Sequence, residues 1–302
     1  MKVLITGATG LIGTQITKLL LEQGIHVNYL TTREEKIKHE HNHKGFLWSP
    51  KKGEIDVACF ENVGSVINLV GASISERWTK SYKKIILESR TETANLLYTT
   101  LQRIDHNVRH FISASGISIY PNDETHLYTE ESTEVDKGFL GEVVVAWEAA
   151  ADQFATLGID VAKVRTGVVF AKKEGAFPEL LKPVRLGVPA PLGSGKQWIS
   201  WIHIDDIAAV YVYVLNKSLV GVYNAVAPTA VNNKKLTRLL ANTLNVPMFL
   251  PNVPGFMLKL VLGEMAVLVL EGQLVSSQKL EKHGFIFRYY NAENAVKNLL
   301  KK

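Results

Sequence analysis

KVLITGATGLIG, residues 2–13, joins a short β-branched run to the start of an amphipathic segment that continues to Gly24. The run reads as a buried strand, and the apolar residues after it recur at helical spacing. In the turn between them, Gly7 permits a tight bend, Gly10 lets the backbone approach a diphosphate, and Gly13 lets the helix lie close to the sheet. Because the helix N-terminus also offers unpaired amide hydrogens, the stretch predicts a dinucleotide-binding turn.

Similar strand-like runs alternate with helical segments through the first half of the chain. They are β-branched and unbroken by polar alternation, as strands covered on both faces are: KVLIT, HVNYLT, SVINLVG, HFISAS and VAKVRTGVV. Helices are expected from about 81 to 104 and in GFLGEVVVAWEAAADQF at 138–154. This alternation predicts an α/β fold, a Rossmann-like doubly wound parallel sheet with ligands at the carboxyl ends of its strands.

The second half of the chain has a different organisation. Pro- and Gly-rich loops such as KPVRLGVPAPLGSGK separate individual helices. We expect residues 1–170 to form the nucleotide-binding domain, with contributions from about 195–228. Residues 171–302 are expected to form mainly a smaller C-terminal lobe that covers the substrate.

The end of the second predicted strand bears on which nicotinamide nucleotide would bind. An NAD site needs an acidic residue there to accept the ribose hydroxyl, but HVNYLTTREEK ends in Thr31, Thr32 and Arg33. Arginine suits a 2′-phosphate because it is a planar donor that is always charged. Glu34 and Glu35 follow directly and are the competing acids, so the sequence favours NADP, with NAD as the alternative.

Composition limits the class of protein. The chain has 302 residues, a net charge of +5 and 21% charged residues, and the two signs alternate along it, which argues against a nucleic-acid arm. A single cysteine, Cys59, excludes an intrachain disulfide and reads as a buried, inert thiol. No signal peptide precedes the first strand, and the apolar run at 256–270 is short and interrupted by charge, so a cytoplasmic protein that does not enter the membrane is expected.

Several motifs together resemble the extended short-chain dehydrogenase/reductase superfamily. They are TGATGLIG, INLVGASISERW at 67–78, ESRTETANLL at 88–97, RTGVVF at 165–170 and GSGKQWISWIHIDDIA at 193–208. With the tail LGEMAVLVLEGQLVSSQKLEKHGFIFRY, they are similar to its "epimerase family" branch, the NAD-dependent epimerase/dehydratase type with its own C-terminal domain. The resemblance covers nearly the whole chain and implies a Rossmann-like sheet, NADP binding and a small-molecule substrate.

The resemblance also implies a set of cofactor contacts. They come from the glycine loop, the end of the second strand, the segment after Asn68, the helix that follows it and the strand at 110–115: Gly7, Thr9, Gly10, Leu11, Ile12, Gly13, Thr32, Arg33, Leu69, Val70, Gly71, Ser89 and Ser113. Ser89 departs from the family, because many extended members have an asparagine at this position.

The Tyr-x-x-x-Lys pair of these reductases is missing. Aligning EAAAD with the helix that follows the family's lysine places Val144 at the tyrosine and Glu148 at the lysine. The lysine ammonium lowers the pKa of the tyrosine toward neutrality, whereas a carboxylate acts in the opposite direction, although it still accepts hydrogen bonds from ribose hydroxyls. The resemblance places Ser113 or Ser115 at the catalytic hydroxyl position and Tyr120 at a tyrosine common after that strand. Ser115 and Tyr120 are the predicted catalytic residues, the alternatives being a plain hydrogen-bonding role for Ser115 and a pocket-shaping role for Tyr120.

Substrate contacts are predicted on the same side of the sheet. Cationic and aromatic groups suit a planar or anionic ligand, and the candidates are Arg77, Trp78, Gln197, Trp201 and His203. His203 is also a candidate proton donor, because imidazole titrates in the useful range. The structural alternatives are that the tryptophans anchor the C-terminal lobe and that Asp205 or Asp206 caps the helix IAAVYVYVL.

Metal binding and partners complete the predictions. HEHNHKG at 39–45 alternates three histidines. It is expected to be a solvated loop without a cysteine or a fixed carboxylate partner, so no metal site is predicted. The expected partner is a small-molecule substrate, without nucleic acid. The resemblance allows a homodimer that forms through the helix at 138–154. The apolar side chains of this helix could equally cover the sheet of their own subunit.

Three functions remain open at this point. The chain is an NADP-dependent oxidoreductase or epimerase with an unusual proton donor, a noncatalytic NADP-binding sensor or partner-binding module, or a binder that uses only the substrate cleft.

Overall fold

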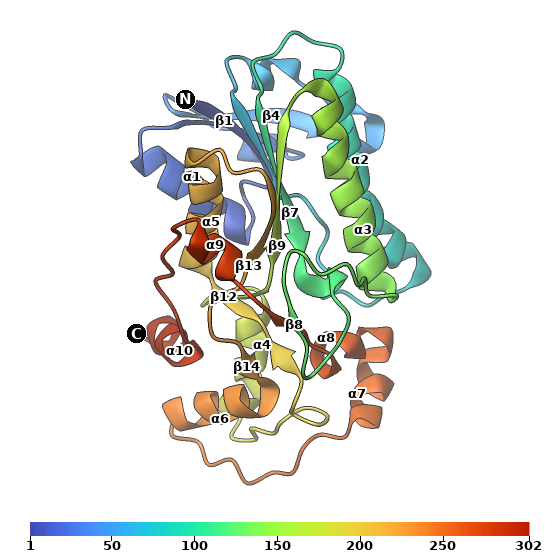
Figure 1. Ribbon diagram of the computed structural model, residues 1–302, viewed down its shortest axis with the longest axis vertical. Helices are drawn as coiled ribbons and strands as arrows, with labels where there is room; N and C mark the ends of the chain where they lie inside the picture. The colour runs from blue at the N-terminus through green and yellow to red at the C-terminus, as the bar shows by residue number, and fades with distance from the viewer. Residues whose placement is uncertain (302) are drawn as a thin grey trace.

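One large, mostly parallel sheet forms the centre of the computed structural model, which describes residues 1–301 (Figure 1). Its strand order is β13-β9-β7-β6-β1-β2-β4-β3, and β5 pairs with β4. The run from β13 to β4 is parallel, and β3 and β5 lie antiparallel to β4. The strands are β1 (Lys2–Thr6), β2 (His26–Thr31), β3 (His39–Glu40), β4 (His43–Ser49), β5 (Glu54–Ile55), β6 (Ser65–Asn68), β7 (His110–Gly116), β9 (Asp160–Thr166) and β13 (Gly221–Ala225).

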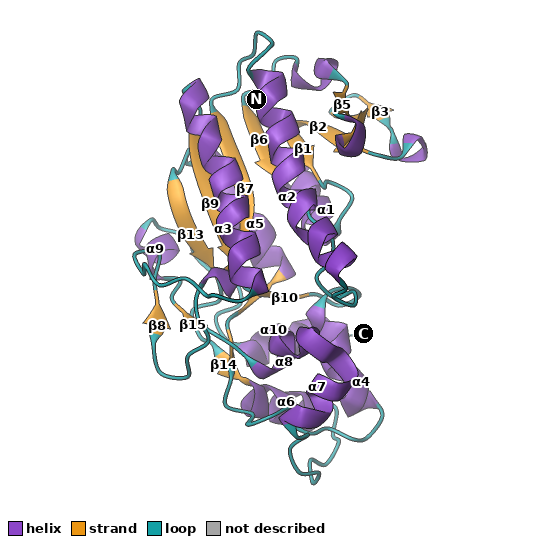
Figure 2. Cartoon of the chain, turned by 90° about the vertical axis from the view of Figure 1, so that its right-hand side faces the viewer, coloured by secondary structure: helices purple, strands orange, loops and turns teal. Residues whose placement is uncertain are grey.

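Helices cover both faces of this sheet (Figure 2). On one face, α1 (Leu11–Glu22) packs beside α5 (Ile204–Asn216), and on the other α2 (Lys80–Leu101) packs beside α3 (Phe139–Asp152). The alternating strand residues divide accordingly: Ile112 and Val164 join the core under α1 and α5, whereas Phe111 and Val161 join the core under α2 and α3. The predicted Rossmann-like fold is confirmed, because its apolar runs are strands that are buried on both faces.

A smaller lobe lies beyond the carboxyl ends of the strands, at the bottom of Figure 1. Its own core packs Phe170, Phe177 and Trp201 against α6 and α10. The remaining helices are α4 (Ala176–Arg185), α6 (Asn233–Thr243), α7 (Gly255–Leu262), α8 (Val267–Leu270), α9 (Gln278–Lys282) and α10 (Ala292–Leu300). Short strand pairs join this lobe together: β10 (Val168–Phe170) with β12 (Trp201–His203), β11 (Trp198–Ile199) with β14 (Val231–Asn232), and β8 (Leu127–Tyr128) with β15 (Leu274–Val275). The domain boundary near residue 170 stays a prediction.

Short 3₁₀ turns shape several of the connections. They are η1 (Glu34–Lys36), η2 (Pro50–Lys52), η3 (Val57–Phe60), η4 (Ile117–Ile119), η5 (Gln153–Leu157) and η6 (Gly263–Ala266). Three of them, η1, η2 and η4, follow the parallel strands β2, β4 and β7 of the large sheet and therefore lie at its carboxyl edge.

The structure corrects two sequence predictions about elements. The long helix ends at Leu101 rather than near 104. The histidine-rich segment is also not simply a solvated loop, since His43 begins β4, which extends the parallel sheet beyond β2. The apolar run of β4 is limited to Phe46, Leu47 and Trp48, and His43, Lys44 and Gly45 precede that run, so a search for longer apolar runs did not find the strand. Within residues 1–301 no group of three or more His, Cys, Asp or Glu side chains is arranged to hold a metal ion.

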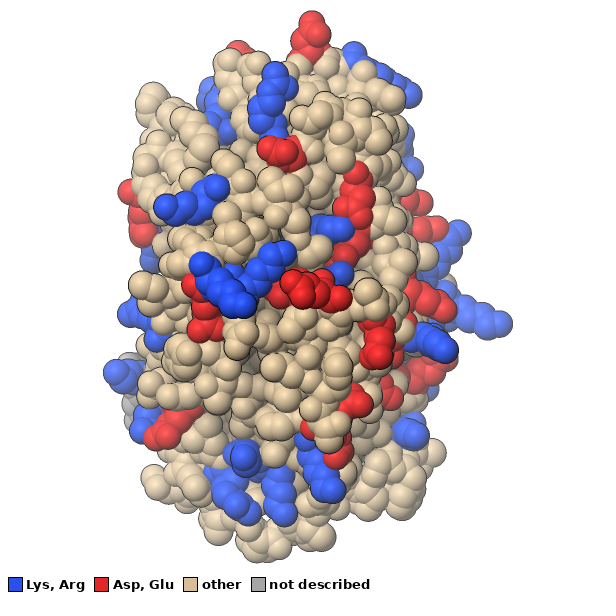
Figure 3. Space-filling view, in the orientation of Figure 1, with Lys and Arg blue, Asp and Glu red and all other residues tan. Residues whose placement is uncertain are grey.

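The helix at 138–154 uses its apolar face within its own subunit. Val143, Trp147 and Ala151 are buried on the side of α2 and the sheet, and Val144 is buried against residues of η4, β8 and β15. Lys, Arg, Asp and Glu side chains are interspersed over the face shown in Figure 3. No helix in the described range, 1–301, combines the length and the apolar character that a bilayer span requires.

Candidate functional site

The glycine loop between β1 and α1 forms an open cradle of backbone amides. Gly7 has a φ of +71° and its carbonyl accepts from the Gly10 amide at 3.0 Å. Helix α1 begins after Gly10, and within residues 1–301 no side chain caps it and no acidic residue lies in its first turn. The free amides and the helix dipole therefore favour an anion here. Leu11 and Ile12, both half-buried, are the first helical residues, and Gly13 is buried beneath them.

A cavity of about 280 Å³ lies beside this loop at the carboxyl ends of β1, β2, β4 and β6. It brings together four of the predicted cofactor residues, Thr9, Thr32, Arg33 and Val70. The other lining residues are Thr31, Lys36, Trp48 and Pro50. Arg33 and Lys36 therefore both face one cavity, whereas Glu34 and Glu35, the competing acids, are exposed and do not line it.

Lys36 is a site residue that the sequence analysis missed. It lies three residues after Arg33, and side chains at this spacing eclipse one another in a 3₁₀ turn such as η1. The turn is fixed by Tyr29, whose hydroxyl donates to the Lys36 carbonyl at 2.6 Å and accepts from the Lys38 amide at 2.9 Å. The three-residue spacing is visible in the sequence, but it places Lys36 beside Arg33 only when the chain forms the 3₁₀ turn η1.

The segment after β6 lies directly against the glycine loop. A Cβ built on Gly7 would meet the backbone and the Cβ of Leu69 at 3.3 Å. Leu69 and Val70 are half-buried, and Gly71 is exposed. Ser89 on α2 fixes this segment, since its hydroxyl accepts from the Ala72 amide at 2.8 Å and donates to the Ile86 carbonyl at 3.0 Å.

Ser113, like Ser89, was predicted to contact the cofactor. It is 1% exposed and its hydroxyl donates to the Ala114 carbonyl. Both hydroxyls are thus occupied by backbone partners.

Glu148, which occupies the lysine position, is part of a buried ion pair. Arg165 donates to both of its carboxylate oxygens, from Nε at 2.7 Å and from Nη2 at 2.8 Å. Ser115 donates to the same carboxylate at 2.6 Å. Arg165 also donates from Nη1 to the Tyr120 hydroxyl at 2.8 Å, and that hydroxyl donates to Asn224 Oδ1 at 2.9 Å. The two predicted catalytic residues are therefore linked through the Glu148–Arg165 pair, Ser115 by its bond to Glu148 and Tyr120 by its bond to Arg165.

This network fixes the protonation states of its members. Burial alone would raise the pKa of the Glu148 carboxyl, but Arg165, Ser115 and Lys163 together hold it below its ordinary value. Burial raises the pKa of the Tyr120 phenol in spite of the neighbouring Arg165. At neutral pH the chain thus holds an ionised Glu148 with its acceptor sites engaged and a neutral Tyr120 that is not activated as a base.

Val144, at the tyrosine position, faces the carboxyl end of β7. A Cβ built on Gly116 would lie 3.5 Å from Val144 Cγ2 and 3.4 Å from Ser118 Oγ. Ser118 is half-buried, unlike Ser115 and Tyr120, which are 4% and 0% exposed. The sequence analysis missed Ser118, because it lies in the turn η4 after the strand rather than in the strand itself.

The predicted substrate residues do not form one surface. Trp201 is fully buried and stacks on Phe170, with ring centroids 5.1 Å apart, so its position corrects the predicted substrate contact to a packing role. Trp78 is also buried, and its indole donates to the Ile74 carbonyl. Gln197 is buried and donates to the Leu192 and Val269 carbonyls, which joins parts of the lobe. Arg77 alone of the five predicted residues is exposed.

His203 is the N-cap of α5. Its Nδ1 accepts from the Asp205 amide at 3.1 Å, and its ring, 1% exposed, stacks on Tyr289 at 3.8 Å between centroids. This corrects the expectation that Asp205 or Asp206 caps the helix. Asp206 instead accepts from the amides of Arg288 and Tyr289, which holds the C-terminal segment in place. Burial lowers the pKa of the His203 imidazole, so a substrate role for this side chain is not supported by its position.

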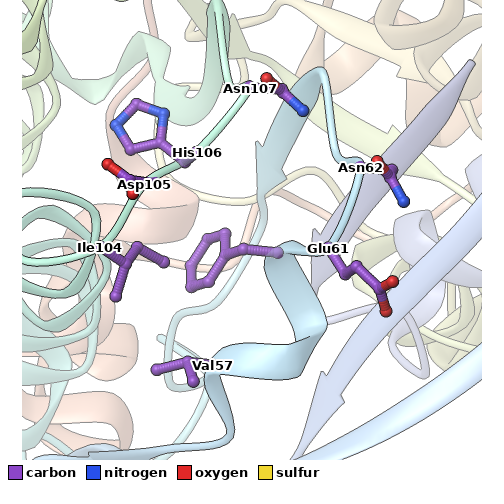
Figure 4. Close-up of a pocket in the computed structure, with 8 residues that line it drawn as sticks. Val57, Glu61, Asn62, Ile104, Asp105, His106 and Asn107 are labelled. Atoms are coloured by element: carbon purple, nitrogen blue, oxygen red, sulfur yellow. The ribbon is translucent and has the colours of Figure 1, made fainter.

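A second cavity, of about 290 Å³, lies at the opposite edge of the sheet (Figure 4). It is lined by residues that precede β6, such as Val57 and Asn62, and residues that precede β7, such as Ile104 and Asn107. These segments lie at the amino ends of the strands, whereas ligands of doubly wound sheets bind at the carboxyl ends. The cavity is therefore separate from the candidate site.

The fold and the site together define a dinucleotide-binding protein of the Rossmann type. The glycine cradle and the adjoining cavity fit a nucleotide diphosphate with its adenosine end near Arg33.

The chain belongs to the NAD dependent epimerase/dehydratase family, whose model matches residues 3–225. Residues 253–299 match a domain of unknown function, DUF1731. An epimerase family protein of Staphylococcus saprophyticus, SSP1921, is 35% identical over 298 residues, which cover 98% of each chain. These matches confirm the family that the sequence motifs resemble.

Two solved structures resemble the protein over its whole length. The human epimerase family protein SDR39U1, solved with NADPH, has a TM-score of 0.84 and 29% identity, with 99% of each chain covered. A nucleoside-diphosphate sugar epimerase from Corynebacterium glutamicum has a TM-score of 0.78 and 27% identity, and covers 99% of this chain and 58% of its own.

Proposed function

We propose that the protein binds NADP(H) and acts as an oxidoreductase or epimerase on a small molecule, a carbonyl compound or a sugar nucleotide. The observation that carries the proposal is the cavity beside the glycine loop, into which Arg33 and Lys36 both project without an acidic residue. Two cations suit the 2′-phosphate that distinguishes NADP from NAD. The NADPH in the similar human structure supports the same cofactor.

The residues present fit this cofactor along its length. The amides of Leu11, Ile12 and Gly13 would hold the diphosphate, and the segment 69–71 would border the next part of the molecule. A bound nicotinamide supplies or accepts hydride. The chain itself would supply the proton. Ser118 is a half-buried hydroxyl that, like Val144 at the position of the family's tyrosine, lies close to Gly116.

Cofactor preference gives the direct test. Replacing Arg33 and Lys36 by alanine is expected to weaken NADPH binding about 100-fold, because each loses a charge-assisted contact with the 2′-phosphate. NADH binding should change little, since NADH lacks that group. Calorimetric titration of both nucleotides measures this, with Glu34→Gln/Glu35→Gln as the matched control on the same turn. A wild-type protein that binds NADH as tightly as NADPH would overturn the assignment.

Turnover tests the three hydroxyl groups. With a substrate found by screening NADPH oxidation and sugar-nucleotide epimerisation, Ser118→Ala is expected to lower kcat about 100-fold, the typical effect of a proton donor. Ser115→Ala and Tyr120→Phe should have smaller effects, because their hydroxyls bond to Glu148, Arg165 and Asn224. Product analysis is needed for epimerisation, which regenerates its cofactor. The reverse ranking of the variants would return the donor role to Ser115 or Tyr120.

A noncatalytic NADP-binding sensor is the second candidate function. The observation that favours it is the same network, in which the Ser115 hydroxyl bonds to Glu148, the Tyr120 hydroxyl bonds to Arg165, and Arg165 pairs with Glu148. Tight NADPH binding without turnover of any carbonyl compound or sugar nucleotide in the screen would support this candidate over the enzyme.

A further inference from the structure

Arg90 is a buried cation without an anionic partner in the described part of the chain. Arg90 is 9% exposed, and no carboxylate of residues 1–301 forms an ion pair with its guanidinium. Nη1 donates to the Ile86 carbonyl at 2.7 Å and Nη2 to the Ala72 carbonyl at 3.2 Å, while Nε is buried without a hydrogen-bond partner in this range. The guanidinium also lies 4.8 Å from the centroid of the Trp147 ring.

Such a charge is costly to bury. Burial lowers the pKa of Arg90 to about 10, so the group is still cationic at neutral pH. Carbonyl dipoles and a ring face compensate only part of the lost hydration of a guanidinium. Arg165, by contrast, is also buried but forms a bidentate pair with Glu148. The protein therefore neutralises one buried arginine and leaves the other without a counter-charge.

Arg90 lies immediately behind the predicted cofactor segment. A Cβ built on Gly71 would lie 2.9 Å from Arg90 Cζ, so the absence of a side chain at Gly71 lets the guanidinium approach the exposed backbone. Because Leu69 contacts Gly7, this segment is continuous with the glycine loop. The cation is thus separated by one layer of backbone from the surface on which a diphosphate would lie.

Arg90 and Ser89 also both form hydrogen bonds with Ala72, which directly follows Gly71. Ser89 accepts from the amide of Ala72 at 2.8 Å, and Arg90 donates to the carbonyl of the same residue at 3.2 Å. Both backbone groups of Ala72 are therefore held by adjacent residues of α2. This contact fixes the path of residues 69–72 relative to the helix.

We propose that Arg90 is a positioning residue of the cofactor site, whose buried charge favours an anionic diphosphate in front of Gly71 and which fixes the segment 69–72 together with Ser89. The proposal rests on the proposed function, since it takes the diphosphate of NADP(H) as the missing counter-charge. It also explains Gly71 by the space that the guanidinium requires.

The test compares ligands with and without a diphosphate on the full-length protein. Arg90→Met is expected to weaken NADPH binding about tenfold, the effect of removing one charge near the ligand at an intermediate effective dielectric. Binding of adenosine 2′-monophosphate, which has no diphosphate, should stay unchanged. Arg90→Lys keeps the charge but loses the planar fork, so an intermediate loss for NADPH is expected. Lys84→Met, an exposed change on the same helix, is the matched control.

The outcomes separate this role from a purely structural one. Equal losses for both ligands, or NADPH binding by a folded Arg90→Met protein that equals wild type, would overturn the proposal. If Arg90→Met does not fold, the Arg90→Lys protein decides, since a loss confined to NADPH supports the proposal and equal losses refute it.

Inorganic pyrophosphate distinguishes failure of this proposal from failure of the proposed function. In one outcome, pyrophosphate raises the Tm of wild type, Arg90→Lys reduces this rise, and NADPH does not bind. This outcome would support Arg90 as part of an anion site and refute NADP(H) as its ligand. A wild-type protein that binds neither NADPH nor pyrophosphate refutes both.

Discussion

Gly13→Ala is expected to abolish measurable NADPH binding and to destabilise the protein by about 3 kcal/mol, the upper part of the range for overpacking. A Cβ at this position would lie 2.2 Å from the Gly7 carbonyl oxygen and 2.8 Å from the Ala8 Cα. These contacts are backbone atoms of the glycine loop, so they cannot be relieved by a change of rotamer. The start of α1 must move away from β1, and the amides that would bind the diphosphate move with it.

The loss of affinity should be at least about 100-fold, because about 3 kcal/mol of hydrogen bonds to a charged ligand depend on this loop. Calorimetric titration with NADPH and urea unfolding measure the two effects separately. Gly64→Ala is the matched control, since a Cβ there meets nothing within 4 Å and the φ is not positive. It should bind NADPH normally with unchanged or slightly raised stability. Gly13→Ala protein with wild-type NADPH affinity would contradict the assigned role of the loop.

The parts of the fold that were predictable are those in which local sequence and global topology agree. The glycine loop directly links a continuous apolar strand to an amphipathic helix, and both elements formed as expected, with β1 at Lys2–Thr6 and α1 at Leu11–Glu22. β4 was missed because its apolar run, residues 46–48, is short, and because only its pairing with β2 establishes it as a strand. Local patterning cannot supply that pairing.

The candidate site likewise contains residues that the sequence could predict and residues that only the folded structure identifies. Arg33 was predictable because it follows a recognisable strand, whereas Lys36 needed the conformation of η1. Glu148 could be placed at the lysine position from the sequence, but its partner could not. Arg165 is 17 residues away on β9, and the register that aligns it with Ser115 on β7 exists only in the folded sheet.

The pairing of β9 with β7 explains the role of the carboxylate that stands at the lysine position of the missing Tyr-x-x-x-Lys pair. A carboxylate at the lysine position could accept hydrogen bonds from a ribose, but in the folded protein its oxygens bond to Arg165 and Ser115. Glu148 therefore neutralises a buried cation instead of presenting a charge to the cofactor. We propose that proton transfer uses a group outside this network, for which Ser118 is the half-buried candidate at the carboxyl end of β7.

Glu148→Gln should accordingly destabilise the protein by about 3 to 5 kcal/mol, the cost of leaving a buried charge without its partner. The amide keeps the shape of the side chain but leaves the Arg165 guanidinium uncompensated. Arg165→Met should cost a similar amount, because it leaves the Glu148 carboxylate buried alone. The double variant Glu148→Met/Arg165→Met is expected to recover much of the loss, since apolar replacements of a whole buried pair are often nearly neutral. Urea unfolding at neutral pH of wild type, Glu148→Met, Arg165→Met and the double variant gives the coupling energy between the two side chains.

The pH dependence identifies the charge as the cause. The folded state holds the pKa of Glu148 below its ordinary value, so the ion pair contributes its full stability above the unfolded pKa and loses it as the pH falls through the folded pKa. The gap between wild type and Glu148→Gln should therefore be constant near neutrality and shrink in acid. Glu142→Gln, an exposed change on the same helix, should stay within about 0.5 kcal/mol of wild type throughout. A gap that persists unchanged in acid would mean that side-chain shape, rather than ionisation, is what Arg165 requires of residue 148.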